Sequence, residues 1–232
     1  MTNPAIKQFR PAGDYVQMRT EWLKNYDRLT YTGLSGYVLR STHALIERDF
    51  SPNDSFQHVI EVGAGTLAHL PFVRHRFDKY VVSDSDPDVV AALEKRPLPP
   101  GVEVVGLPTG AIPFPDNSFD RLIATHVLEH IPNPVSALEE WVRVLKPGGV
   151  LSIVLPCDPG LAWRVGRRLG PRSRWTTNNL PYDYFMAREH VNNIFGLISI
   201  LSYHLPVGKA QWWPLGLPLP DFNLIFAANY RV

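Results

Sequence analysis

Residues 59–70, VIEVGAGTLAHL, join a short apolar run to an acid and two glycines. The opening residues have the β-branched content of a strand buried in a parallel sheet. The segment GAGTLA at 63–68 fits the G-x-G-x-x-G/A pattern of a dinucleotide-binding turn. Glycines let backbone amides approach a ligand closely, and a helix that starts there adds its positive end. The stretch therefore predicts a strand, a nucleotide-binding turn and a helix reaching about residue 76.

Strands and helices are expected to alternate on both sides of this turn. Helices are predicted near 37–48, from Pro87 and from Pro134, where Asp86 and Asn133 are suitable N-caps. A helix followed by a strand is expected after residue 185. The remaining strands are predicted at 58–62, 80–84, 102–107, 119–125, 150–156 and 222–232. Short links between alternating elements predict an α/β fold with a doubly wound, mostly parallel, seven-stranded sheet.

The change of pattern after residue 157 predicts one domain with an insertion. Internal repeats and a clear linker are both missing from the sequence. We therefore expect a single domain over 1–232, divided into N-terminal helices or a lid (1–57), a cofactor-binding core (58–157), an acceptor-side insertion (158–221) and a last strand (222–232).

The composition of the chain limits the classes of protein to which it can belong. With 232 residues and 45% hydrophobic content the chain can bury a sizeable core. A net charge of +1 gives no overall bias toward nucleic acid or membranes. The single cysteine, Cys157, excludes an internal disulfide and a cysteine-based metal site, and we expect no metal. The first residues lack the apolar core of a signal peptide, and no apolar run approaches the length of a membrane span. The expectation is a cytoplasmic protein.

Asp84 ends the second predicted strand, 21 residues after Gly63, where a carboxylate can accept hydrogen bonds from ribose hydroxyls. That spacing suits a nicotinamide cofactor and S-adenosylmethionine (SAM) equally. Four motifs in order resemble those of class I SAM-dependent methyltransferases of the small-molecule type. They are EVGAGT (61–66), VSDSDPDVV (82–90), IPFPDNSFD with THVLEHI (112–120 and 125–131) and LKPGGVLSIVLP (145–156).

The resemblance implies SAM as the cofactor and gives each motif residue a role. Glu61 would organise the loop near the amino-acid end of the cofactor. Asp84 would hold the ribose diol, with Ser85 beside the adenine. Thr125 and His126 would lie near the methionine moiety and the transferable methyl group. The backbone that would pack against the cofactor is that of Gly63, Ala64 and Gly65.

Two positions depart from the family pattern. Leu67 stands where the third glycine of the first motif is usual, which narrows the conformational freedom of the turn. Pro108 stands about where many relatives carry an acid that binds the adenine amine. Adenine binding would then depend on apolar contacts and on the backbone of Thr109 and Gly110.

Methylation of a hydroxyl normally needs a base, and histidine titrates closest to neutral pH. His126, just after the fourth strand, and His190, in the insertion, are the two candidate catalytic bases. Asp158, beyond the fifth strand, could orient a base or bind an acceptor hydroxyl. Structural roles are expected for Glu129 and His130, and a helix-surface position for His69.

The segment 163–175, WRVGRRLGPRSRW, carries five arginines between two tryptophans. Arginines bind phosphate or carboxylate through paired hydrogen bonds, and tryptophan suits sugars or a membrane interface. The segment favours an anionic acceptor, peripheral membrane contact, or simply a solvated helix. Tyr15, Tyr26 and Tyr31 are expected either to form a lid over the cofactor or to pack in the ordinary way.

The leading interpretation is a SAM-dependent methyltransferase that acts on a hydroxyl of a sugar-containing or anionic small molecule. N- and C-methylation stay open, as do the acceptor and the oligomeric state. The alternatives are a nicotinamide-dependent oxidoreductase and a non-catalytic SAM-binding protein. Nucleic acid is not expected as a substrate, because the near-zero net charge and the missing Asn/Asp-Pro-Pro-aromatic motif of base-flipping amino methyltransferases argue against it.

Overall fold

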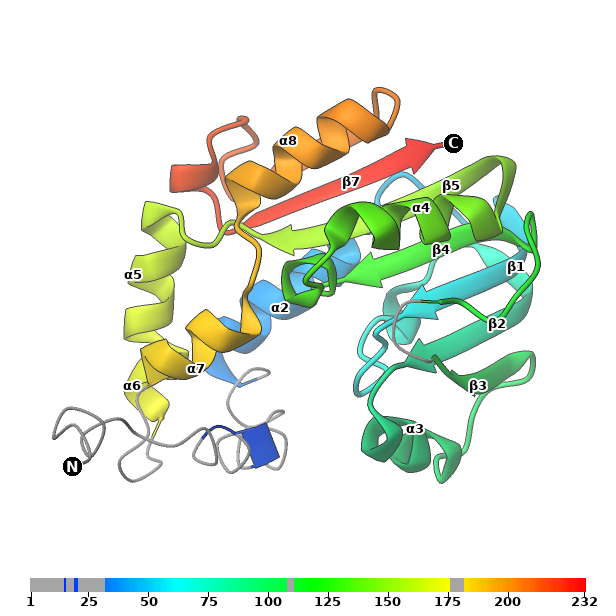
Figure 1. Ribbon diagram of the computed structural model, residues 1–232, viewed down its shortest axis with the longest axis horizontal. Coiled ribbons are helices and arrows are strands. Elements are labelled where there is room, and N and C mark those ends of the chain that lie inside the picture. The colour runs from blue at the N-terminus through cyan, green and yellow to red at the C-terminus, as the bar shows by residue number, and fades with distance from the viewer. Residues whose placement is uncertain (1–14, 16–18, 21–31, 108–110, 176–181) are drawn as a thin grey trace, which may run out of the picture.

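A seven-stranded sheet with the order β3-β2-β1-β4-β5-β7-β6 forms the centre of the protein (Figure 1). The computed structural model describes residues 15, 19–20, 32–107, 111–175 and 182–232. Strands β1 to β5 run parallel, and β7 runs antiparallel to β5 and β6. This confirms the predicted α/β sheet. The strands are β1 (Ser55–Val62), β2 (Arg76–Asp84), β3 (Val102–Gly106), β4 (Phe119–Thr125), β5 (Leu145–Pro156), β6 (Lys209–Trp213) and β7 (Ile225–Arg231).

Helices cover both faces of the sheet (Figure 1). On one face, α4 (Pro134–Val144) and α8 (Ile194–His204) bury Trp141 and Leu197 in the largest apolar cluster, together with Ile60 of β1. On the other face, α2 (Gly33–Ile46) buries Ile46 against Val154 of β5. Helix α3 (Pro87–Glu94) packs beside β2 and β3. The alternation of β1 side chains between two apolar clusters explains why both faces need cover.

The predicted N-caps are confirmed. The Asp86 carboxylate accepts from the backbone N–H of Asp88 at 2.9 Å, and Asn133 Oδ1 accepts from Ser136 N–H at 3.2 Å. Each side chain satisfies a donor that the first turn of the helix leaves free. Helix α4 ends at Val144, and β5 begins at Leu145, five residues before the predicted start at residue 150.

The predicted helix after the glycine turn is wrong. Only a 3-10 turn, η2 (Leu70–Phe72), forms there. Leu67 has φ +65°, and an α-helix cannot run through a left-handed residue. Pro71 has no N–H to donate to a helical hydrogen bond. The turn therefore has no helix N-terminus to offer a ligand.

The insertion stands beyond the carboxyl ends of β4 and β5 (Figure 1). It contains α5 (Leu161–Leu169), α6 (Pro171–Arg174) and α7 (Tyr182–Glu189). The helix expected after residue 185 is two helices, because α7 stops at Glu189 and Asn193 caps the start of α8. The described residues also form the 3-10 turns η3 (Leu128–His130) after β4 and η4 (Pro220–Phe222) before β7. Within the described ranges, none of the helices has the length and hydropathy of a membrane span.

Candidate active site

The two glycines of the turn after β1 serve different purposes. Both have a positive φ, +67° at Gly63 and +51° at Gly65. A Cβ added at Gly63 would lie 2.6 Å from Cγ2 of Val127, so the protein's own packing requires this glycine. A Cβ added at Gly65 would find nothing within 4 Å. Gly65 therefore keeps open space beside the backbone, which is the feature that a closely approaching ligand needs. Ala64 is buried and donates its N–H to the Ser83 carbonyl at 2.9 Å.

Asp84, at the end of β2, holds the turn in place. Its Oδ2 accepts from the Gly65 N–H at 3.0 Å, and its Oδ1 accepts from the Asp86 N–H at 2.9 Å. A carboxylate has about four acceptor positions, so both oxygens keep capacity for the ribose hydroxyls that the sequence predicts. Ser85 beside it is exposed, while Thr109 and Gly110 lie outside the described residues.

Glu61 lies beneath the turn and is only 1% exposed. Its Oε2 accepts from the Tyr80 hydroxyl at 2.7 Å, which ties β1 to β2. Burial raises the pKa of Glu61, and His69 and the Tyr80 hydrogen bond offset only part of that rise. The Glu61 side chain thus stabilises the turn from beneath, through its buried hydrogen bond to Tyr80. Its role toward the amino-acid end of the cofactor stays a prediction.

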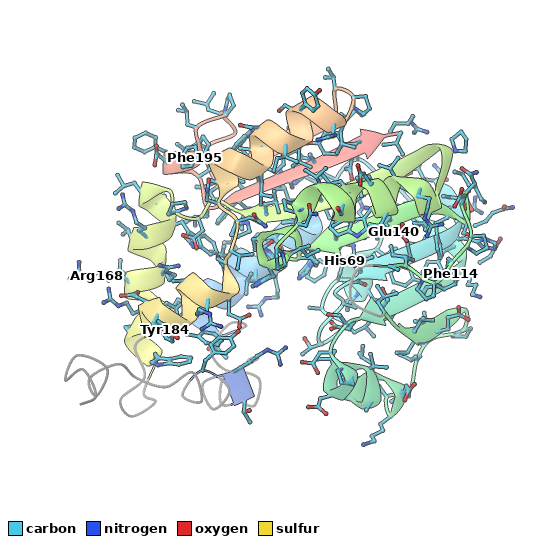
Figure 2. The ribbon with its side chains drawn as sticks, in the orientation of Figure 1. His69, Phe114, Glu140, Arg168, Tyr184 and Phe195 are labelled. Atoms are coloured by element: carbon cyan, nitrogen blue, oxygen red, sulfur yellow. The ribbon has the colours of Figure 1, made fainter. Side chains whose placement is uncertain are left out.

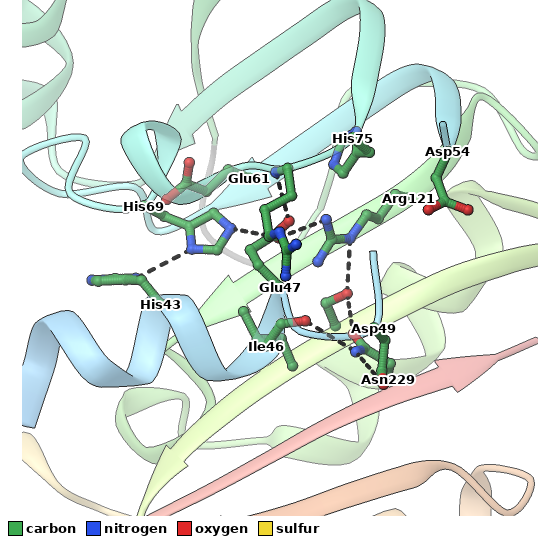
Figure 3. Close-up of polar contacts among 12 residues, drawn as sticks. His43, Ile46, Glu47, Asp49, Asp54, Glu61, His69, His75, Arg121 and Asn229 are labelled. Carbon is green, nitrogen blue, oxygen red and sulfur yellow. Dashed lines mark hydrogen bonds and ion pairs between the residues drawn. The ribbon is translucent and has the colours of Figure 1, made fainter. Parts of the chain in front are cut away.

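A buried polar network continues from this point toward α2 (Figure 3). Arg121 of β4 and Glu47, just after α2, form an ion pair at 2.7 Å with both side chains fully buried. His69 Nε2 lies 3.2 Å from Oε1 of Glu47, and its Nδ1 lies 3.2 Å from Nδ1 of His43. Burial alone would raise the pKa of Glu47, but His69 and Arg121 hold it at about 2. The expected surface position of His69 is wrong, because the segment after the turn folds back onto α2.

A cavity of about 540 Å³ opens at the carboxyl ends of β4 and β5, on the insertion side of the turn. Most of its wall is apolar, and its histidines and Glu129 lie near those strand ends. The apolar wall includes Val38, Leu39, Trp163, Phe185, Met186 and Leu224. The lining residues with charged or imidazole side chains are His126, Glu129, His130, Arg167, Glu189 and His190. Both predicted bases therefore face one cavity. Volume and lining are typical of a site for a small organic molecule.

His126 has partners at both ring nitrogens. Its Nε2 lies 3.3 Å from the Thr42 hydroxyl, and its Nδ1 lies 3.6 Å from Oε1 of Glu129. The Thr42 hydroxyl donates to the Leu39 carbonyl at 2.7 Å, so it is left to accept from His126. His126 also has φ +58°, which turns the chain sharply after β4. These contacts suit a residue that shapes the cavity better than one that accepts a proton.

His190 is oriented by a carboxylate. Its Nδ1 lies 2.8 Å from Oδ2 of Asp158, and the same oxygen accepts from Arg167 Nη1 at 3.0 Å. Burial alone would raise the pKa of Asp158, but His190 and Arg167 hold it below its usual value. The ionised Asp158 fixes the His190 tautomer with the proton on Nδ1 and leaves Nε2 as the acceptor. The sequence indicated that Asp158 could orient a base, but it did not identify His190 as the partner.

Glu129, expected to be structural, is a charged group of the cavity. Burial alone would raise its pKa, but His126 and the nearby His130 and His190 outweigh burial and hold the pKa below its usual value. The carboxylate is therefore ionised although its side chain is 3% exposed. Its position in the sequence did not predict a buried charge, because an acidic residue after a strand is most often exposed to solvent.

The arginine-rich segment divides between cavity and solvent. Arg167 lines the cavity and its guanidinium lies 5.7 Å from the centre of the Tyr182 ring. Arg168 points away from the molecule on α5 (Figure 2). Tyr15 packs on Phe185 and donates to the Glu189 carboxylate, while Tyr26 and Tyr31 lie outside the described residues. The lid over the cofactor stays a prediction.

Comparison with known proteins identifies the core. Residues 60–153, from β1 into β5, match the family described as a methyltransferase domain. This part of the chain is therefore similar to a methyltransferase domain. A SAM-dependent methyltransferase from Aquifex aeolicus has the same fold, with a TM-score of 0.56 and 19% identity over 90% of this chain and 96% of that one. The family's cofactor is SAM, and the nicotinamide-dependent alternative loses its support.

Curated relatives of the methyltransferase domain have named acceptors. The 2-methyl-6-phytyl-1,4-hydroquinone methyltransferase 1 of Oryza sativa subsp. japonica is 27% identical over 167 residues, 67% of this chain and 49% of that protein. The phosphatidylethanolamine N-methyltransferase of Cereibacter sphaeroides is 32% identical over 99 residues, 41% of this chain and 49% of that protein. The chain therefore spans about half the length of the curated relatives it matches.

The residues around the turn fit SAM. Open space beside Gly65 admits a ligand against the backbone, and Asp84 offers acceptors to a ribose diol. The cavity at β4 and β5 begins at His126, where the resemblance puts the transferable methyl group. In sheets of this topology ligands bind where the strand order reverses, here between β1 and β4.

Proposed function

We propose that this protein transfers a methyl group from SAM to a hydroxyl of a small, largely apolar acceptor. One observation carries the proposal: a mainly apolar cavity whose histidines and Glu129 lie near the carboxyl ends of β4 and β5. A reaction between two bound molecules needs two sites that meet, and this arrangement supports such a pair of sites.

The lining favours an apolar acceptor over a sugar. Side chains such as Trp163, Phe185 and Met186 form most of the wall. Arg167, which lines the cavity, is paired with Asp158, so much of its charge is already neutralised. The names of the relatives refer to a phytyl-substituted hydroquinone and to a phospholipid, which are both largely apolar. We infer a hydrophobic ring or chain that carries one reactive hydroxyl.

The cofactor, when bound, supplies a methyl group already activated on a sulfonium, so the chain needs only to align the acceptor and manage one proton. The apolar wall excludes water and holds the acceptor's body. Asp158 holds His190 with Nε2 as the acceptor nitrogen, which would take the proton from the hydroxyl. His126 and Thr42 shape the junction between the two sites.

Transfer of a trideuterated methyl group from labelled SAM tests the proposal. The acceptors are a short-chain alkyl hydroquinone and, for comparison, a nucleotide-sugar, with products followed by mass spectrometry. We expect the label on the hydroquinone oxygen and none on the sugar. His190→Asn should lower kcat about a hundredfold, a typical loss for a missing general base, while Arg168→Ala should leave it unchanged.

Two results would contradict the proposal. Label on the nucleotide-sugar alone would show that the apolar wall does not select the acceptor. SAM binding without transfer to any acceptor would favour the non-catalytic SAM-binding protein instead.

A further inference from the structure

Three side chains at the polar end of the cavity have the composition of a metal site. Glu129 and His130 come from η3, and His190 follows α7. One ligand atom from each lies within 4.8 Å of the other two. The rings of His130 and His190 are perpendicular, with centres 5.0 Å apart. All three residues line the cavity.

Both histidines have one ring nitrogen fixed by an acceptor. His130 Nδ1 lies 2.8 Å from the Glu189 carbonyl, and His190 Nδ1 lies 2.8 Å from the Asp158 carboxylate. Because these oxygens accept, each Nδ1 carries the proton and each Nε2 keeps a free lone pair. Metal-binding histidines in proteins almost always donate their other N–H to a carbonyl or carboxylate in this way.

Glu129 supplies an independent observation. Its Oε2 is buried and has no hydrogen-bond partner among the residues that the structure describes. Its Oε1 lies 3.6 Å from His126 Nδ1 and 4.0 Å from His130 Nε2, both beyond ordinary hydrogen-bond length. A buried carboxylate oxygen without a donor is costly to leave unsatisfied. A cation placed between Glu129 and the two histidines would satisfy it.

We propose that Glu129, His130 and His190 bind a divalent transition-metal ion of the zinc class, with positions of the ion left open to the cavity. Two imidazole nitrogens and one carboxylate oxygen are a set that zinc accepts, and a catalytic zinc keeps a further position for water or substrate. Ligand atoms at about 2.0–2.1 Å from a tetrahedral ion lie about 3.4 Å apart, so binding draws the three side chains together by roughly 1 Å. The proposed site is an alternative to the sequence-based expectation of no metal.

An ion there would change how the acceptor reacts, a consequence that rests on the proposed function. A hydroxyl bound to zinc loses its proton to water far more readily than a free one. The resulting oxygen anion forms the bond to the methyl carbon as the bond from that carbon to sulfur breaks, with the electron pair kept by sulfur. His190 Nε2 cannot bind an ion and accept a proton at once. The two roles of His190 therefore predict opposite effects of chelation.

Cobalt titration of the untagged full-length protein, stripped with a chelator, tests the site. Co²⁺ reports its ligands by visible absorption, and Zn²⁺ competition gives the affinity. We expect one ion per chain, at least a hundredfold weaker binding in Glu129→Gln, and loss of the visible band in His190→Asn. His204→Asn, at an exposed position on α8, is the matched control and should bind as the wild type does.

Each outcome of the titration either supports or overturns the proposed metal site. Stoichiometric binding that E129Q and H190N abolish, with unchanged thermal midpoints, supports the site. No binding, or equal binding by the variants, overturns it. The titration uses neither SAM nor acceptor, so it tests the metal site even if the proposed methyl transfer is not observed. Full transfer activity in the chelated protein would overturn the catalytic role of the ion, and loss that Zn²⁺ restores would support it.

Discussion

Replacing Gly65 by alanine should weaken SAM binding far more than it weakens the fold. At φ +51° an alanine is held in the left-handed region, which costs about 1–2 kcal/mol. Alanine also reduces the conformational entropy of the unfolded chain, which raises the free energy of unfolding by about 0.4–1 kcal/mol. Since nothing lies within 4 Å of the new Cβ, no clash adds to this. The net loss of unfolding free energy is about 1 kcal/mol, or roughly 2–4 °C for a chain of this size.

The same methyl group would occupy the space through which the cofactor reaches the backbone of the turn. We expect at least a tenfold rise in the Kd for SAM, about 1.4 kcal/mol, measured by isothermal titration calorimetry. Gly216→Ala is the matched control, because Gly216 has φ +74° and also no atom within 4 Å of an added Cβ. It lies in the loop after β6, so its Kd for SAM should stay within twofold. Equal SAM affinity in both variants would refute the placement of the cofactor at the turn.

Three further predictions follow from individual contacts. Arg121→Met leaves the buried Glu47 carboxylate without its arginine partner and should lower the unfolding free energy by about 3–5 kcal/mol. The double variant Arg121→Met/Glu47→Gln should recover much of that free energy. Equal losses in the single and the double variant would contradict the pairing of these two residues. Burial, helped by Arg121, lowers the pKa of His75 to about 4, so the unfolded chain binds the proton first and stability falls as the pH drops from 6.5 toward 4. His75 should therefore contribute about 2 kcal/mol to the loss that urea unfolding measures between pH 7 and pH 5. His75→Phe should reduce the loss by that amount, and an unchanged pH slope in the variant would rule this out. Arg167→Ala should raise the acceptor KM at least fivefold because Arg167 lines the cavity, while Arg168→Ala, at an exposed site, should not; identical kinetics would exclude Arg167 from acceptor binding.

The sheet was predictable because its signals are local. Strand β4 spans Phe119–Thr125, as its apolar run predicts, and Asp86 and Asn133 cap the helices that follow them. The carboxyl ends of parallel strands share one edge, so the order of the motifs was enough to bring Gly65, Asp84 and His126 to the same side of the fold.

The site was harder to predict because its contacts join distant parts of the chain. Asp158 and His190 are 32 residues apart, and nothing in either segment marks them as a pair. The helix predicted after the turn does not form because the backbone of Leu67 is left-handed. A leucine side chain disfavours that conformation, so the sequence did not indicate it. Arg121 lies in the middle of an apolar strand, where a charged side chain needs a buried partner. Its identity as Glu47 comes only from the way α2 packs against the sheet.

Calorimetric titration of the wild-type protein with SAM, with its demethylated product and with NAD tests the central claim most directly. Our account predicts that SAM and its product each bind at one site per chain, that they compete, and that NAD does not bind. Binding of NAD without binding of SAM would contradict it.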